Sequence, residues 1–196
     1  MDSKYTMKSM SSTQSNAIVL ISDNNQPNCL FDQITKNVYI GNVEAAKNKK
    51  LLSEHSIKRV VNVTDDKDNF FNDDFEYFRL SVEDRRTKFK IMREKLSEAL
   101  NFIEASEKNT LIHCNAGTSR SATVLLAYVM KTQKISLKEA FEYVLSRRSK
   151  DSYTHPNVGF FQKVLLPFEK TLFGKTSMNM SDYQLMDSSG YLHLVR

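Results

Sequence analysis

Apolar residues in the middle of the chain form four short runs of strand length. These runs are rich in β-branched and aromatic residues, and they cover residues 37–41, 57–63, 75–82 and 110–114. Several are nearly continuous in apolar character, which is typical of strands buried on both faces of a sheet. The pattern therefore predicts a central, twisted and mostly parallel sheet.

Between and after these runs, apolar residues recur at helical spacing. One amphipathic stripe covers residues 89–103, and a long apolar helix is expected to begin near Arg120. The segment Ser136–Glu139 has the form of a capping box, and a last stripe at residues 158–172 is expected to kink near Pro167. Strands that alternate with helices and are followed by a block of helices favour an α/β fold with helices flanking the sheet.

Composition divides the chain into three parts. Residues 1–30 are rich in Ser, Asn and Gln, and we expect them to be mostly disordered apart from an apolar patch at residues 17–21. Residues 31–174 form the predicted domain. Residues 175–196 are again polar, and we expect an irregular tail.

The loop after the fourth predicted strand carries the strongest chemical signal. Cys114 and Arg120 stand at its two ends. The residues between them are small and uncharged: Asn115, Ala116, Gly117, Thr118 and Ser119. Backbone N–H groups at a helix N-terminus bind anions and favour a thiolate, and an arginine chelates two phosphate oxygens. The loop is therefore predicted to bind phosphate, with Cys114 placed to attack phosphorus.

Each of these residues also has a plainer interpretation when it is considered alone. Cys114 taken alone is typical of a core residue, and Arg120 taken alone is typical of a charge at a helix end. A metal site of His113 and Cys114 is disfavoured, because neighbours on a strand point to opposite faces and no further Cys or His cluster completes a ligand set. We therefore predict no metal at the site.

The stretch "HCNAGTSRSATVLLAYVM" resembles the signature of the cysteine-dependent protein phosphatases, most closely the dual-specificity branch. The similarity covers about residues 33–173 and implies a tyrosine-phosphatase-like fold. It also implies hydrolysis of phosphotyrosine and phosphoserine/phosphothreonine through a cysteinyl-phosphate intermediate, without a cofactor. By resemblance, Ser121 donates to the leaving thiolate, His113 helps to set the loop, and Asn157 supports it. A helix cap is an equally good interpretation of Asn157.

The general acid has more than one candidate. Asp65 and Asp66 follow the second predicted strand and Asp84 follows the third, so all three are eligible on position alone. The resemblance implies that "VEDRRTKF" carries the acid, at Asp84. Asp66 is the alternative acid. Without a catalytic role, residues 65–74 are interpreted as a solvated acidic loop.

Composition bears on where the protein is located and on whether it binds membranes or nucleic acids. The 196 residues include two cysteines and carry a net charge of +5, with no apolar run near the roughly 20 residues that span a bilayer. No secretory signal is recognisable at the start. We expect a cytoplasmic location, with the nucleus open as a second one, and expect neither nucleic-acid binding nor membrane insertion. The sequence specifies no oligomeric state.

Phosphorylated proteins are the expected substrates. Phosphoinositide phosphatases with this loop usually carry lysines inside it, which this loop lacks, and no segment resembles the pocket-deepening loop of tyrosine-only enzymes. Four basic residues follow the proposed acid and predict a preference for acidic residues or a second phosphate near the target: Arg85, Arg86, Lys88 and Lys90. A solvated helix start is the alternative interpretation of these residues. Competing functions are a phosphoprotein-binding pseudophosphatase and, more remotely, an RNA 5′-triphosphatase or a phosphoinositide phosphatase.

Overall fold

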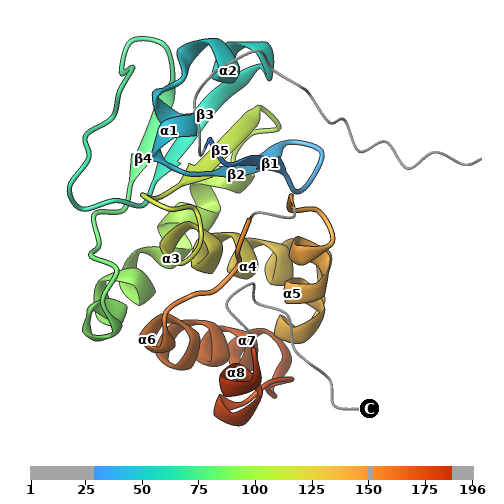
Figure 1. Ribbon diagram of the computed structural model, residues 1–196. Coiled ribbons are helices and arrows are strands. Elements are labelled where there is room, and N and C mark those ends of the chain that lie inside the picture. The colour runs from blue at the N-terminus through green and yellow to red at the C-terminus, as the bar shows by residue number, and fades with distance from the viewer. Residues whose placement is uncertain (1–28, 150–151, 187–196) are drawn as a thin grey trace, which may run out of the picture.

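A five-stranded sheet forms the centre of the computed structural model, which describes residues 29–149 and 152–186 (Figure 1). The strands run in the order β1-β2-β5-β3-β4, and all neighbours are parallel except the antiparallel pair of β1 and β2. Their bounds are Phe31–Gln33 (β1), Val38–Gly41 (β2), Ile57–Asn62 (β3), Glu76–Arg79 (β4) and Asn109–His113 (β5). The predicted sheet and its four strands are confirmed, and β1 is an additional edge strand.

Helices cover both faces of the sheet. Two short helices, α1 (Val43–Lys47) and α2 (Lys49–Glu54), lie on one side of the sheet, and the remaining ones lie on the other, where α5 and α7 pack against α4 and α4 packs against the sheet (Figure 1). Those are α3 (Phe89–Glu104), α4 (Arg120–Gln133), α5 (Leu137–Leu145), α6 (Val158–Phe160), α7 (Leu166–Phe173) and α8 (Met180–Leu185). Side chains alternate between the two layers, so that Leu111 of β5 joins the cluster under α1 and α2 while Ile112 joins the larger cluster around α4.

Helix α4 lies at the centre of the larger layer. Every residue from Arg120 to Met130 is buried, as expected for a helix surrounded by other elements. The sheet on one side and α3, α5 and α7 on the others leave no room for the helix to shift. Its N-terminus is therefore held firmly at the end of β5, where the predicted phosphate loop lies.

The other predicted helices are confirmed, with irregular ends. The capping box of Ser136 and Glu139 starts α5, with the Ser136 hydroxyl and the Glu139 carboxylate each bonded to the other residue's backbone N–H. A π-helical stretch, Phe161–Leu165, separates α6 from α7, and Pro167 stands in the first turn of α7. The expected kink near Pro167 is thus replaced by a π-helical stretch just before it, through which the chain stays helical. A 3-10 turn, Arg86–Lys88 (η1), precedes α3.

The expectation of an irregular polar tail from residue 175 is wrong as far as residue 186. Helix α8 starts with a capping box of Asn179 and Asp182, and Met178 and Met186 on either side of it are buried in the main core. One turn and a half of helix offers too few residues for a visible periodicity, and isolated methionines in a polar stretch do not reveal burial. The expectations for residues 1–28 and 187–196 lie outside the described residues.

No helix within the described ranges is both long enough and apolar enough to cross a membrane.

Candidate active site

The candidate site lies where the parallel strands end. The loop of residues 114–119 follows β5, Asp65 and Asp66 follow β3, and Asp84 follows β4. Because the carboxyl ends of parallel strands meet at one edge of the sheet, these side chains converge there, together with the loop that precedes α6.

Cys114 forms the base of the loop. Its side chain is 1% exposed, and its Sγ atom accepts the backbone N–H of Gly117 at 3.3 Å. Ser121, on the first turn of α4, brings its Oγ atom to 3.2 Å from the same sulfur. Donors aimed at sulfur stabilise a thiolate, which is the nucleophilic form of cysteine.

Gly117 is required by the shape of the loop. Its φ is +72°, a conformation that residues with a side chain rarely adopt. A Cβ atom there would lie 2.9 Å from the carbonyl oxygen of Gly41, at the end of β2. The loop therefore packs directly on the neighbouring strand, which fixes the position of its amides.

Arg120 is buried and oriented by the two loops that follow β3 and β4. Its Nη1 donates to Asp65 Oδ1 at 2.8 Å and to the carbonyl oxygen of Val82 at 3.1 Å, and its Nε lies 3.9 Å from Asp84 Oδ2. Asp65 thus lies in an exposed acidic loop, as the plain interpretation expects, and is also the ionic partner of this arginine.

Asp84 stands above the loop with two hydrogen-bond donors on one carboxylate oxygen. Ser119 Oγ donates to Oδ1 at 2.8 Å, and Asn157 Nδ2 donates to it at 2.6 Å. The backbone N–H of Asn157 in turn donates to Ser119 Oγ at 3.0 Å. The second oxygen of Asp84 is the one that faces Arg120.

Asn157 caps α6, which is one of its two predicted roles, and the phosphate loop is contacted by its backbone N–H, at Ser119 Oγ. Its Oδ1 atom accepts the N–H groups of Gly159 and Phe160 and so caps α6, while its Nδ2 atom holds Asp84. One amide side chain thus connects the start of α6 with the candidate acid.

Asp66, the alternative acid, is fully exposed. Hydrogen bonds from Lys67 and then from Asn115 lower its pKa to about 2. These donors stabilise the ionised form of Asp66. Its bond to Asn115 instead ties the β3 loop to the phosphate loop.

His113 ends β5 and is fully buried. Burial, helped by the charge of Arg120 and opposed by the Cys114 backbone, lowers its pKa to about 4, so the ring is neutral at physiological pH. Within residues 29–149 and 152–186, no three His, Cys, Asp or Glu side chains are grouped as a metal would require.

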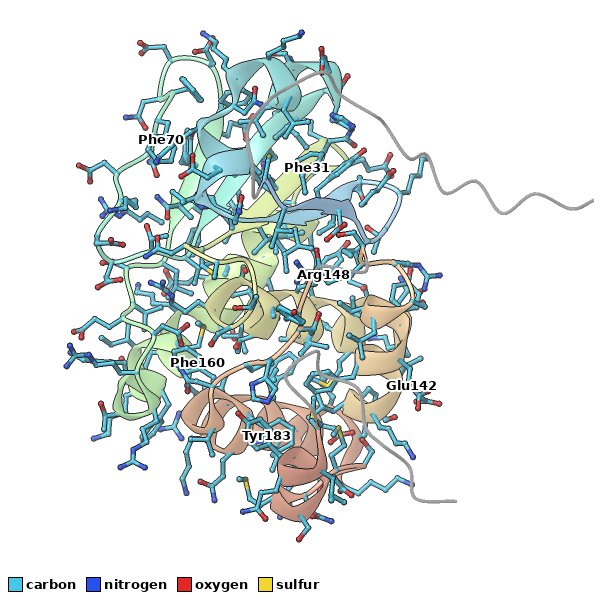
Figure 2. The ribbon with its side chains drawn as sticks, in the orientation of Figure 1. Phe31, Phe70, Glu142, Arg148, Phe160 and Tyr183 are labelled. Carbon is cyan, nitrogen blue, oxygen red and sulfur yellow. The ribbon has the colours of Figure 1, made fainter. Side chains whose placement is uncertain are left out.

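Two site-supporting residues were not found from the sequence. Arg148, which follows α5, donates from Nη1 to the carbonyl oxygen of Gly117 at 2.7 Å, and its Nε pairs with Asp32 of β1 at 3.2 Å (Figure 2). Both side chains are buried, although 116 positions separate them in the chain. No local pattern could have revealed such a pair.

Three groups meet at this site: a cysteine at the base of the loop, an arginine at the start of the next helix and a carboxylic acid beside them. This arrangement defines a cysteine-dependent phosphatase. The chain belongs to the dual-specificity phosphatase family, because the model of the dual specificity phosphatase catalytic domain matches residues 38–171. The expected resemblance is thereby confirmed, and the protein is a dual-specificity protein phosphatase.

Individual relatives agree with this assignment. The chain is 38% identical to mouse dual specificity protein phosphatase 18 over 153 residues, which cover 78% of this chain and 79% of the relative. It is 34% identical to human dual specificity protein phosphatase 14, over 76% of this chain and 73% of the relative. A mouse putative dual specificity phosphatase, solved in complex with zinc tungstate, superposes with a TM-score of 0.65 at 27% identity and covers 79% of this chain and 95% of its own.

Proposed function

We propose that Cys114 is the nucleophile of this phosphatase. The observation that carries the proposal is the position of its sulfur, which lies at the base of the loop, accepts the Gly117 N–H and faces Ser121. The Cys114 thiolate attacks phosphorus, an S–P bond forms, and the bond from phosphorus to the substrate oxygen breaks.

The proposed general acid is Asp84. A neutral Asp84 gives its proton to the departing oxygen, which leaves as a tyrosine, serine or threonine hydroxyl. Asp84, now a carboxylate, then takes a proton from water as the water oxygen attacks phosphorus. The S–P bond breaks, inorganic phosphate leaves, and the Cys114 thiolate is restored. The bonds from Ser119 and Asn157 support this assignment because they hold the carboxyl group beside the loop.

Arg120 and the loop amides are proposed to stabilise the phosphoryl oxygens. A cation and preorganised N–H groups are most effective where charge spreads over the equatorial oxygens. Those amides belong to the loop residues Asn115, Ala116, Gly117, Thr118 and Ser119. Ser121 is proposed to donate to the thiolate when the S–P bond breaks, and neutral His113 to support the loop from below.

The family acts on phosphoproteins, and we propose that this enzyme prefers acidic sequences near the phosphorylated residue. Of the four basic residues after Asp84, Arg85 and Lys88 share one counter-charge, because both pair with Glu83. The preference is therefore proposed to rest on the remaining two, Arg86 and Lys90. Selectivity between acidic and neutral phosphopeptides should fall in Arg86→Ala and remain in Arg85→Ala, and equal selectivity in all variants contradicts the proposal.

The mechanism is tested by phosphate release from matched phosphotyrosine, phosphothreonine and phosphoserine peptides in the presence of a chelator. We expect turnover of all three classes, abolished in Cys114→Ser and lowered by about 10²-fold or more in Asp84→Asn. Turnover of phosphotyrosine alone would keep the mechanism but contradict the expected turnover of phosphothreonine and phosphoserine. Binding without turnover in the unmodified protein would instead identify a phosphoprotein-binding module.

A cytoplasmic or nuclear location is also proposed. Both cysteines, Cys29 and Cys114, are free thiols, and the chemistry needs the second to stay reduced. A fluorescent fusion of the full chain should be seen in these compartments, and its entry into the secretory pathway would contradict the proposal.

A further inference from the structure

Helix α8 lies outside the residues that the family model matches, 38–171, yet it contacts the segment that leads into α6. The hydroxyl of Tyr183 donates to the carbonyl oxygen of Pro156 at 2.9 Å. Its ring lies 5.1 Å from the ring of His155 and 4.6 Å from that of Phe161, measured between centroids. Figure 2 shows Tyr183 on the side of α8 that faces this segment.

The segment that Tyr183 contacts, residues 155–157, is bonded to the catalytic groups at three points. The N–H of His155 donates to the carbonyl oxygen of Thr118 at 2.9 Å. The N–H of Asn157 donates to Ser119 Oγ at 3.0 Å, and its Nδ2 donates to Asp84 at 2.6 Å. A shift of this short segment would therefore be passed on to both the phosphate loop and Asp84.

Contacts outside that segment also hold α8 against the core. Met178 is 3% exposed and Met186 is 7% exposed, one on each side of the helix. Before them, the N–H of Ser177 donates to the buried carboxylate of Glu169, and Ser177 Oγ accepts the N–H of Lys138 at the start of α5. The helix is thus a fixed support against which residues 155–157 rest.

We propose that Tyr183 is a positioning residue for general acid catalysis. It holds the Pro156 carbonyl and the His155 ring, and thereby keeps Asn157 where its amide aims Asp84 at the leaving-group oxygen. This inference rests on the proposed role of Asp84. Burial and the nearby charge of Asp84 raise the pKa of Tyr183, so its hydroxyl stays protonated and continues to donate.

If Tyr183 positions Asp84, its loss should slow some substrates more than others, whereas a purely structural role would affect all substrates equally. A poor leaving group, such as the tyrosine phenolate, needs its proton in the transition state, whereas the weakly basic p-nitrophenolate leaves with little help. Misplacement of Asp84 should therefore slow hydrolysis of phenyl phosphate and phosphotyrosine peptides much more than hydrolysis of p-nitrophenyl phosphate.

The experiment compares kcat/KM for phenyl phosphate and p-nitrophenyl phosphate in four variants of the full chain. Tyr183→Phe removes only the hydroxyl, Tyr183→Ala also removes the ring, and Asp84→Asn is the reference for loss of the acid. Leu185→Ala is the matched control, because Leu185 lies on the same helix with 54% of its surface exposed. Thermal unfolding of each variant shows whether it is folded.

We expect Tyr183→Ala to lower kcat/KM for phenyl phosphate about tenfold, with a change of less than about twofold for p-nitrophenyl phosphate. Tyr183→Phe should show a smaller loss with the same dependence on the leaving group, and Leu185→Ala should show neither. Equal losses on both substrates, or none in folded Tyr183 variants, would overturn the inference. If Asp84→Asn itself shows no dependence on the leaving group, the proposed role of Asp84 fails instead.

Discussion

The buried pair of Asp32 and Arg148 offers a direct test of how strand β1 supports the phosphate loop. In Asp32→Ala, the guanidinium of Arg148, whose side chain is 1% exposed, loses its counter-charge. The backbone N–H of Ser149 and the hydroxyl of Ser152 also lose their acceptor, because both donate to the same carboxylate. Three interactions disappear with one side chain.

The expected loss follows from the burial of the pair. Removing one member of a buried ion pair costs about 3–5 kcal/mol of unfolding free energy, because the other charge is left without a partner in a poorly solvated site. Domains of this size lose about 2–4 °C of melting temperature per kcal/mol, so the midpoint should fall by about 6–20 °C. Such a loss is a large share of a typical stability of about 5–15 kcal/mol.

The assay is urea unfolding at pH 7 followed by far-ultraviolet circular dichroism, since the chain has no tryptophan to report by fluorescence. Arg147→Met is the control, because Arg147 is the exposed neighbour of Arg148 and its guanidinium contacts Tyr143 and Ser146 rather than the buried pair. It should stay within about 0.5 kcal/mol of the unmodified protein.

The double variant Asp32→Ala/Arg148→Met should regain part of the lost stability, because it leaves no unpaired buried charge. The recovery should be incomplete, since the carbonyl groups of Gly117 and Tyr153 lose the donor that Arg148 provides. A loss of less than about 1 kcal/mol in Asp32→Ala, the usual worth of an exposed pair, would refute the reasoning. A double variant less stable than Asp32→Ala would refute the counter-charge argument in particular.

Three further outcomes are expected. Gly159→Ala should lower stability by about 3 kcal/mol or more and reduce activity as well, because its Cβ would lie 2.0 Å from the carbonyl oxygen of Arg86 and push the turn after Asp84. The unfolding free energy should decline by up to about 3 kcal/mol as the pH falls from 6.5 to 4, since the pKa of His113 is lowered from its ordinary 6.5 to about 4 and unfolding therefore takes up a proton. Ser121→Ala should turn over p-nitrophenyl phosphate about tenfold more slowly, with a rapid first burst of product, because its Oγ faces the sulfur that must leave in the second step.

Each of these outcomes has a matched control or a contrary result. Gly174→Ala has a positive φ but open space around its Cβ, so it should cost only about 1 kcal/mol and leave activity unchanged. In His113→Gln, the unfolding free energy should decline less between pH 6.5 and 5, whereas in His155→Gln it should decline as in the unmodified protein. If the unfolding free energy of the unmodified protein is constant over this range, the buried His113 ring is not neutral as argued. Steady turnover without a burst in Ser121→Ala would place the slow step elsewhere.

Much of the fold was readable from local pattern. The strand of residues 109–113 and the helix that follows it were predicted because apolar residues have to be buried on a regular period, and this period differs between strand and helix. Helix α8 was missed because its burial rests on single methionines at its ends. Strand β1 was missed because three residues at a sheet edge carry no visible alternation.

The candidate site, like the fold, was only partly predictable from the sequence. The sequence by itself determined the loop from Cys114 to Arg120, since its chemistry is contained in adjacent residues and in the N-terminus of the next helix. Only the tertiary structure showed that Asp65 pairs with Arg120 and that Asn157 bonds to Asp84, the acid that the resemblance had already implied. The partners in these contacts come from loops 55 and 73 positions apart, and chain folding, not sequence spacing, sets the distance between such groups.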